Sequence, residues 1–443
     1  MKKKILIISL FSILVLITII NIFSGNIIGS IILNDNLISI SYGNITNNLG
    51  EYLVNVNYQD NNYPVECSID NINFDKNCSY YLKPGNHEIY LRYKNANVTK
   101  NIEIENKYAG TFGSTLDNLD EYYLALNGTK TLEWTFDYPY EFDRKVTYTI
   151  EDPTIISIEN DTMSGLKVGT TTLTATLVDG NTKNYKIIVT DLILPIAYNN
   201  DKPDLPCEHY TEEEGAILDK ILESRVKEAG VGTRGGVIAA ARFLTLEFPY
   251  MVKYFYENGR LINHTLKPYL DGEGRYYHKG LYLTKSKFND IVRSSYSGPK
   301  LWGCGLYDQS VLRRTTPNGF TCSGFVTWAM LNGGFDVGDV GAGDFAQYNN
   351  DLSDLGPHHE ITYDYMKNGN YKVGDFIAKN GHAALIIGID DKNVYTAESL
   401  PPKVMAHTYE RYEGIVHATI LTYVIEMDGI YPNGDGWYHD MWY

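Results

Sequence analysis

The chain has 443 residues, a length that predicts about three domains at roughly 100–200 residues per domain. Hydrophobic residues make up 44% of the sequence and charged residues 21%, which is typical of a folded protein and excludes wholesale disorder. The formal net charge of -16 argues against nucleic acid as a partner, because phosphate binding depends on clustered Lys and Arg.

The N-terminal segment, residues 1–34, predicts export. Three lysines at 2–4 precede residues 5–23, which carry no charge. As a helix this stretch is about 28 Å long, close to the roughly 30 Å of a bilayer core. We therefore expect an uncleaved transmembrane signal anchor, and so a single-pass protein of the cell membrane with its C-terminal domain extracellular. A cleaved signal peptide, which would give a secreted protein, is the alternative.

The five cysteines are an odd number for an exported chain, so one is expected to be a free thiol. Cys67 and Cys78 lie close in sequence, and Cys207 and Cys304 both lie outside the motif that contains Cys322. The economical hypothesis pairs Cys67 with Cys78 and Cys207 with Cys304. Five unpaired thiols remain the alternative, because connectivity cannot be deduced from sequence alone.

Residues 35–191 have the pattern of an all-β region. Short β-type runs, such as 52–58 and 87–93, are separated by Asn, Asp and Gly turns and show no helical period. Regular strands of this kind predict two immunoglobulin-like (Ig-like) β-sandwiches, at 35–107 and 115–191. Neither offers a catalytic constellation, so we interpret both as spacers or binding modules.

The second of these units resembles the bacterial Ig-like domains of surface adhesins. The residues that carry the resemblance are 126–129 (LNGT), 152–158 (DPTIISI) and 164–175 (SGLKVGTTTLTA). The first unit is Ig-like by its strand pattern.

After the proline-containing segment 194–206 the sequence pattern changes from short β-type runs to apolar residues at helical spacing. This change predicts a separate α+β domain at 207–443. Thr211 and the three glutamates after it lead into apolar residues at helical spacing, a start typical of a capping box. A second predicted helix carries Arg234 and Arg242, which we interpret as surface residues. Strand-like runs follow later in the domain.

The strongest chemical signal is the segment 319–334, GFTCSGFVTWAMLNGG. Its apolar stripe and final glycines predict a helix that begins at Thr321 or Cys322. The free N–H groups and positive dipole end of a helix favour an anion and lower the pKa of a cysteine there. The same N–H groups could hold the oxyanion of an acyl-transfer intermediate. Cys322 is therefore a candidate nucleophile.

Two downstream strands supply a candidate base and a candidate orienting group. His382 opens an apolar strand, and the strand that returns from the turn near Asp390 ends at Glu398. A two-residue loop would pair Leu385 with Glu398 and put the carboxylate on the opposite face from His382. Pairing of Ala384 with Glu398 places both on one face, so we expect an odd loop or a bulge. The three side chains then follow the logic of a catalytic triad.

At these residues the chain resembles the NlpC-type papain-like cysteine peptidases of bacterial cell walls. The resemblance spans about 210–425 and is carried by 322–326 (CSGFV), 374–375 (GD), 381–382 (GH) and 397–399 (AES). It implies a papain-like α+β domain with Cys322 as nucleophile, His382 as base and Glu398 as the residue that orients the base.

The resemblance also implies the function. Peptidases of this family cut peptide bonds in peptidoglycan stem peptides and use neither a metal nor another cofactor. Substrate contact is expected from Thr321 and Ser323, which flank the nucleophile, and from Trp302 and Gly303 in an aromatic-Gly segment. A non-catalytic surface adhesin or wall-binding protein and an N-acetylmuramyl-L-alanine amidase with the same nucleophile are the alternatives. The sequence leaves the bond cut and the oligomeric state open.

Overall fold

The computed structural model describes residues 33–47, 50–105, 110–138, 144–254, 279–289, 301–304, 318–335, 355–379, 381–418 and 420–442. The chain forms two compact units, and the boundary between them passes through the middle β region. The first unit comprises Met1–Phe112, Phe136–Thr147 and Ala175–Lys183, and the second comprises Gly113–Thr135, Tyr148–Thr174 and Asn184–Tyr443.

The N-terminal β region is a sandwich of two three-stranded sheets, β1-β2-β4 and β3-β5-β6. Alternate residues of β2 are buried, as expected for strands with one face on a core. A disulfide joins Cys67 to Cys78 inside that core. Its elements are η1 (Asp35–Leu37), β1 (Ile38–Thr46), β2 (Tyr52–Tyr58), β3 (Glu66–Ser68), β4 (Ser79–Leu82), β5 (Gly85–Tyr93) and β6 (Ala96–Ile104).

The middle β region contains sheets of order β11-β14-β15-β8, β12-β13-β9 and β10-β7. The Ig-like, β-rich character predicted for residues 35–191 is confirmed. Its elements are β7 (Thr111–Ser114), η2 (Thr115–Asn118), β8 (Tyr122–Ala125), β9 (Thr129–Thr131), β10 (Trp134–Asp137), β11 (Thr147–Ile150), β12 (Ile156–Glu159), β13 (Thr162–Gly165), β14 (Gly169–Thr176) and β15 (Thr182–Thr190).

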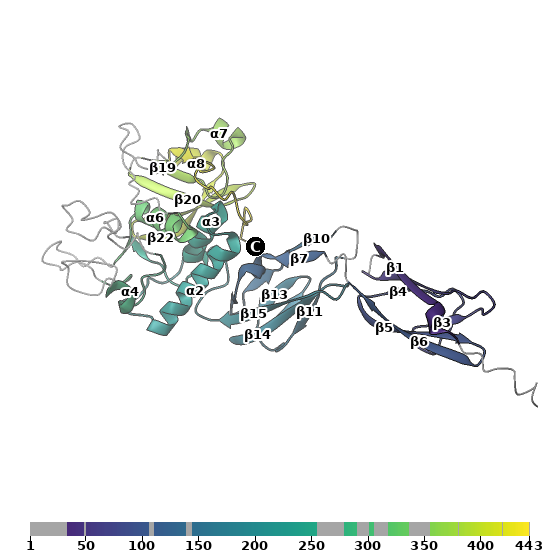
Figure 1. Cartoon of the computed structure of the whole chain (residues 1–443). Coiled ribbons are helices and arrows are strands. Elements are labelled where there is room, and N and C mark those ends of the chain that lie inside the picture. Colours follow the sequence, from purple (N-terminus) through teal and green to yellow (C-terminus); the bar gives the residue numbers. More distant parts are fainter. Residues whose placement is uncertain are drawn as a thin grey trace, which may run out of the picture. The chain divides into compact units, whose positions relative to one another are not determined.

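The C-terminal region combines helices with an eight-stranded sheet of order β17-β16-β22-β21-β20-β19-β23-β18. Helices α3 and α6 pack against β20 (Figure 1). The elements are α2 (Glu212–Ala229), α3 (Arg234–Arg242), η3 (Phe243–Glu247), β16 (Lys253–Tyr254), α4 (Lys285–Asn289), β17 (Gly319–Phe320), α6 (Cys322–Gly333), β18 (His358–Glu360), α7 (Tyr363–Asn368), β19 (Phe376–Lys379), β20 (His382–Ile389), β21 (Asn393–Leu400), β22 (Lys403–Glu410), α8 (Glu413–His417) and β23 (Tyr423–Ile425).

Strand β20 is buried on both faces, which explains its nearly continuous apolar sequence. Ala383 and Leu385 belong to the core that contains residues of α2, α3 and α6. Ala384 and Ile386 belong to a second core, which also contains residues of α7 and α8. A polar side chain at the start of β20 is therefore held beside two packed layers.

Local chemistry fixes the helix starts. At α2 the Thr211 side chain accepts the N–H of Glu214, and the Glu214 side chain accepts the N–H of Thr211, which completes a capping box. Helix α6 ends where Gly334 takes a left-handed backbone conformation at φ 109°, which glycine adopts without strain. A disulfide between Cys207 and Cys304 ties the approach to α2 to the segment 301–304.

The predicted fold class is wrong and is corrected here. Of the residues that the structure describes, 38% lie in strands and 20% in helices, and the C-terminal region does not form a clear papain-like α+β domain. Strands outweigh helices among the described residues because alternating and β-branched runs recur along them, and in the C-terminal region such runs form an eight-stranded sheet.

The predicted membrane anchor is also corrected. Within the described residues, no helix is long and apolar enough to cross a membrane. Residues 5–23, on which the prediction of a transmembrane helix and of a single-pass protein of the cell membrane rested, lie outside the described part of the chain. The predicted localisation therefore has no support in the structure.

Candidate active site

Cys322 is the first residue of α6 and is buried, with 7% of its surface exposed. The helix begins here because the Thr321 side chain accepts the backbone N–H of Gly324 at 3.0 Å. The Cys322 sulfur thus lies at the positive end of a 12-residue helix. It is the one cysteine without a disulfide, and its Sγ lies 3.7 Å from the carbonyl oxygen of Gly381.

His382 and Glu398 form a buried pair on neighbouring strands. His382 opens β20 and Glu398 lies near the end of β21, and His382 Nε2 lies 2.6 Å from Glu398 Oε2. The imidazole is also close enough to the Cys322 sulfur for each group to shift the pKa of the other. With Nε2 turned to the carboxylate, Nδ1 is the ring nitrogen left for the sulfur. The structure thus brings Cys322, His382 and Glu398 together.

A β-bulge produces the register that this pairing needs. Near the turn, Ile389 faces Val394 and Gly388 faces Tyr395; beyond the bulge, Ala384 faces Glu398. Ile387 is the extra residue, and without it Leu385 would face Glu398 and turn the carboxylate away from His382. The bulge, rather than a longer loop, therefore puts imidazole and carboxylate on one face.

Three further side chains hold the second oxygen of Glu398. Oε1 accepts a hydrogen bond from Thr396 at 2.7 Å and from Tyr409 at 3.0 Å, and it lies 3.2 Å from His407 Nδ1. Glu398 itself is completely buried. A buried carboxylate with this many donors is fixed in orientation, so it can in turn fix the ring of His382.

The surroundings of Cys322 favour its thiolate. Burial acts to raise the pKa of the thiol, but the hydrogen bond and positive charge of His382 and the backbone N–H groups of Ala383 and Ser323 act in the opposite direction. The net result is a pKa below the ordinary value for cysteine. The thiolate of Cys322 is therefore more favoured than that of an ordinary cysteine.

The two partners of the thiol are shifted in a matching way. Burial acts to lower the pKa of His382, but its hydrogen bonds to Cys322 and Glu398 raise that pKa to about 9. Burial acts to raise the pKa of Glu398, but hydrogen bonds from His382 and His407 bring that pKa down to about 2. The site therefore favours a thiolate, an imidazolium and a carboxylate side by side.

Most of the residues expected to contact substrate instead cap a helix or pack in the interior. Thr321 caps α6, and Ser323 supplies a backbone N–H near the sulfur. Trp302 is 1% exposed and packs against Tyr282 in the core, so its predicted role in substrate contact is wrong. Gly303 has φ 81°, and a Cβ there would lie 2.4 Å from the carbonyl oxygen of Leu205, so close packing explains this glycine.

Two residues that hold the triad were not identified from the sequence. Thr396 lies two positions before Glu398 on the same strand and therefore on the same face, a signal that strand periodicity contains. Tyr409 lies on β22, and only the pairing of β22 with β21 brings it to the carboxylate. His407, on the same strand, contacts Glu398 but does not replace it as the partner of His382.

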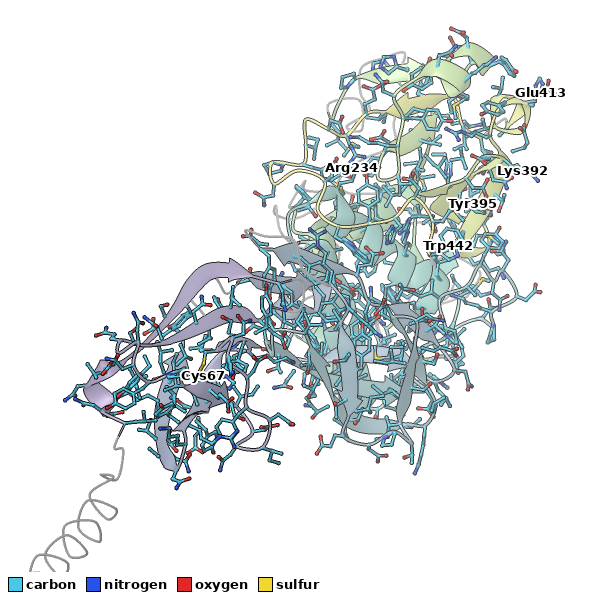
Figure 2. The ribbon with its side chains drawn as sticks, turned by 90° about the vertical axis from the view of Figure 1, so that its right-hand side faces the viewer. Cys67, Arg234, Lys392, Tyr395, Glu413 and Trp442 are labelled. Carbon is cyan, nitrogen blue, oxygen red and sulfur yellow. A yellow bond between two sulfur atoms is a disulfide. The ribbon has the colours of Figure 1, made fainter. Side chains whose placement is uncertain are left out.

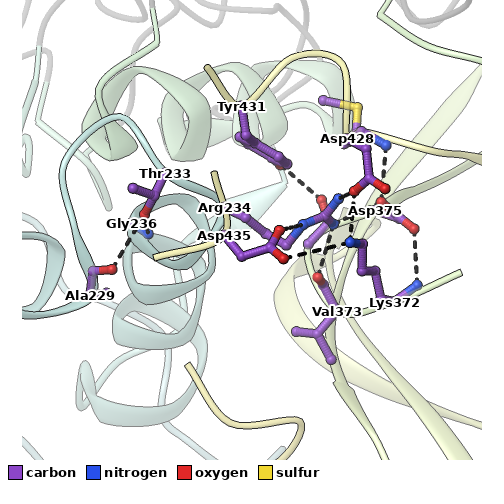
Figure 3. Close-up of polar contacts among 12 residues, drawn as sticks. Ala229, Thr233, Arg234, Gly236, Lys372, Val373, Asp375, Asp428, Tyr431 and Asp435 are labelled. Atoms are coloured by element: carbon purple, nitrogen blue, oxygen red, sulfur yellow. Dashed lines mark hydrogen bonds and ion pairs between the residues drawn. The ribbon is translucent and has the colours of Figure 1, made fainter. Parts of the chain in front are cut away.

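Arg234, interpreted from the sequence as a surface residue, is fully buried, so that interpretation is wrong. Figure 3 shows its guanidinium among three carboxylates: it bonds Asp375 at 2.8 Å, Asp435 at 3.1 Å and also Asp428. It also donates to the carbonyl of Val373 at 3.0 Å. The residue ties α3 to the turn before β19 and to the C-terminal segment.

Arg242, at the end of α3, holds the bulge of β20. Its Nε and Nη2 donate to the carbonyl oxygen of Ile387 at 2.8 and 2.6 Å, and Nη2 also donates to the carbonyl oxygen of His439 at 2.8 Å. Trp442 lies beside Tyr395 of β21, with 5.0 Å between ring centroids (Figure 2). The C-terminal segment therefore packs against the strand pair that carries His382 and Glu398.

Within the described residues, no group of three or more His, Cys, Asp and Glu side chains is arranged to hold a metal ion. The chemistry available at the site is that of the sulfur, the imidazole, the carboxylate and the N–H groups of α6.

No protein-family model and no curated protein matches the chain. Solved structures similar to it include the S-layer protein rSbsC(31-844), at 14% identity and a TM-score of 0.17, which covers 36% of this chain and 28% of that one. A C-terminal fragment of intimin in complex with the translocated intimin receptor has 15% identity and a TM-score of 0.19, and covers 42% of this chain and 78% of that one.

Extracellular domains 3–5 of Drosophila OTK are similar at 14% identity and a TM-score of 0.17, over 34% of this chain and 61% of that one. The chain thus spans less than a third of the length of the S-layer protein. Likeness at this level gives no information on activity.

Proposed function

We propose that the chain is a cysteine-dependent hydrolase that cleaves amide bonds in the stem peptides of peptidoglycan. The observation that carries the proposal is the convergence of Cys322, His382 and Glu398, from three separate elements, in one buried cluster. Sequence distance makes such an array improbable as a by-product of packing: 60 residues separate the sulfur from the imidazole in the chain. Burying charged groups costs folding stability, and clusters of buried groups with shifted pKa values are found mainly at functional sites.

The geometry suggests the order of steps. The Cys322 thiolate attacks the carbonyl carbon of the amide and forms a C–S bond, while the oxyanion is stabilised by N–H groups at the start of α6. The His382 imidazolium gives its proton to the leaving amine as the C–N bond breaks. Neutral His382 then takes a proton from water, the resulting hydroxide attacks the thioester, and the carboxylic acid product leaves as the thiolate is regenerated.

The substrate class rests on the resemblance to NlpC-type cell-wall peptidases. Two disulfides, Cys67–Cys78 and Cys207–Cys304, support it because structural disulfides persist in oxidising surroundings such as those outside the cytoplasm, where peptidoglycan lies. The Ig-like regions fit a protein of the cell surface.

The decisive experiment compares the full chain with its Cys322→Ala variant on purified sacculi, with released muropeptides measured by mass spectrometry. We expect the variant to lose activity by roughly 10³-fold or more, because no other group supplies the nucleophile. Circular dichroism and thermal unfolding of the variant check that the fold is kept. Equal release by both proteins would refute the proposal.

The products distinguish the alternatives. Cleavage between amino acids of a defined stem peptide identifies an endopeptidase, whereas release of the intact peptide from N-acetylmuramic acid identifies an N-acetylmuramyl-L-alanine amidase. If the full chain binds sacculi but cleaves neither sacculi nor defined stem peptides, it is a non-catalytic wall-binding protein or adhesin, and the proposal is wrong.

A further inference from the structure

A cavity of about 230 Å³ lies away from the candidate triad, within the second compact unit. Its walls come from four parts of that unit: the middle β region, the segment after it, the helices α2 and α3 with η3, and the C-terminal segment. Its charged lining residues are Lys130, Arg225, Glu228, Arg242 and Glu247. Neither Cys322 nor His382 lines it.

Positive charge predominates among these lining residues, although the chain as a whole has a net charge of -16. Three cations, Lys130, Arg225 and Arg242, face two carboxylates, Glu228 and Glu247. Both carboxylates are already engaged: Glu228 by Lys130 and Glu247 by Arg225. An anion is thus the ligand charge that this cavity complements.

Arg225 provides the main evidence for an anion site. It is 8% exposed, and its Nε and Nη2 are used by Glu247 and by the carbonyl of Tyr123. Its Nη1 is buried and has no hydrogen-bond partner among the described residues. The guanidinium lines the cavity at a mostly buried position, where its positive charge attracts an anion more strongly than it would at an exposed site.

Arg242 adds a second guanidinium with the same preference. Its hydrogen bonds go to the carbonyl oxygens of Ile387, His439 and Asp440, and no carboxylate lies within ion-pair distance of it among the described residues. A carboxylate in the cavity would be the charge that Arg242 lacks at close range.

The rest of the wall suits a peptide end. Ile196, Leu246 and Met441 provide an apolar surface for one side chain. Asn127 and Thr129 are exposed and offer polar groups to the amide of the preceding residue. We propose that this cavity binds the C-terminal residue of a peptide: its carboxylate next to Arg225 and Arg242, and its apolar side chain against Ile196.

Two probes that differ only in the carboxylate test this site. N-acetylleucine has the carboxylate, and N-acetylleucine amide has the same body without the charge. Isothermal titration calorimetry on the full chain should show binding of N-acetylleucine and at least tenfold weaker binding of the amide. Equal binding of the two probes, or binding of neither, overturns the proposal.

A pair of variants at an exposed lining residue locates the binding. Ile196 is 44% exposed, so its replacement should leave the fold intact. Ile196→Glu removes apolar surface and places a competing carboxylate at the cavity, whereas Ile196→Gln removes the same apolar surface without adding charge. The affinity for N-acetylleucine should therefore be at least tenfold weaker in Ile196→Glu than in Ile196→Gln. Equal affinity in the two variants, with thermal unfolding of both unchanged, would show that the probe binds elsewhere.

Discussion

The sulfur of Cys322 and the imidazole of His382 shift each other's pKa in opposite directions. The positive ring lowers the pKa of the thiol, and the thiolate contributes to a pKa of about 9 for the ring. Glu398 adds to the second effect by its hydrogen bond at 2.6 Å. The thiolate and imidazolium therefore coexist in the pH window between the lowered pKa of the thiol and the pKa of about 9 of the ring, which is the state that attack and proton donation require.

This window predicts different pH profiles for alkylation and for hydrolysis. Since Cys322 is the free cysteine, iodoacetamide under non-reducing conditions should label it with an apparent pKa below the roughly 8.5 of an ordinary thiol. Hydrolysis should fall as the pH rises through about 9, because the raised pKa of His382 means that the ring loses its proton there. Alkylation should stay fast at that pH. Labelling that follows an ordinary thiol would contradict the paired state.

Glu398→Gln tests the carboxylate. The substitution keeps the shape of the side chain but removes the charge that raises the pKa of His382, so we expect kcat/KM for stem-peptide cleavage to fall by roughly 10²-fold. The upper limb of the pH profile should move below about 9.

Tyr409→Phe is the matched control for this prediction, because it removes one hydrogen bond to Oε1 and leaves the charge of Glu398 in place. Its effect should be below tenfold. If Glu398→Gln leaves the upper limb where it was, the carboxylate does not set the protonation of the ring.

At the scale of elements, the β20–β21 pair shows what the sequence could and could not predict. The count of residues between His382 and Glu398 was enough to require either an odd loop or a bulge. The carbonyl oxygen of the bulged residue Ile387 accepts hydrogen bonds from Arg242, which lies on a helix about 145 positions earlier in the chain. A contact so distant in sequence leaves no local pattern.

Arg242→Met tests whether the bulge positions the carboxylate. Loss of the two hydrogen bonds to Ile387 should destabilise the fold by about 1–3 kcal/mol, because the carbonyl oxygen loses its partner. If the register relaxes, the Glu398–His382 contact weakens, kcat falls and the upper limb of the pH profile moves to lower pH.

The control is Lys227→Met, which removes one positive charge from an exposed position of α2. It should change neither stability nor the pH profile. An Arg242→Met protein that is less stable but has an unchanged pH profile would show that Arg242 supports the fold without positioning Glu398.

At the scale of the whole molecule, the alternation of short strands predicted the Ig-like β-rich regions, since each strand buries every second residue. The papain-like α+β class predicted for the C-terminal region was wrong. Strand β20 is apolar at nearly every position because packed layers cover both of its faces, and a continuous apolar run does not by itself distinguish a strand from a buried helix. The buried ion pairs were missed for a related reason: a charged residue such as Arg234 has no sequence mark that separates a surface position from a buried one.

Replacement of Arg234 should lower the stability of the second compact unit. Arg234→Met leaves Asp375, which is 1% exposed, without its buried partner, so we expect the free energy of unfolding to fall by about 3–5 kcal/mol. Lys372→Met is the control, because Lys372 is 35% exposed and pairs with Asp428 at the surface, where such a pair contributes at most about 1 kcal/mol. Urea unfolding monitored by tryptophan fluorescence measures both. Equal effects of the two substitutions would mean that the buried guanidinium does not hold α3, the turn before β19 and the C-terminal segment together.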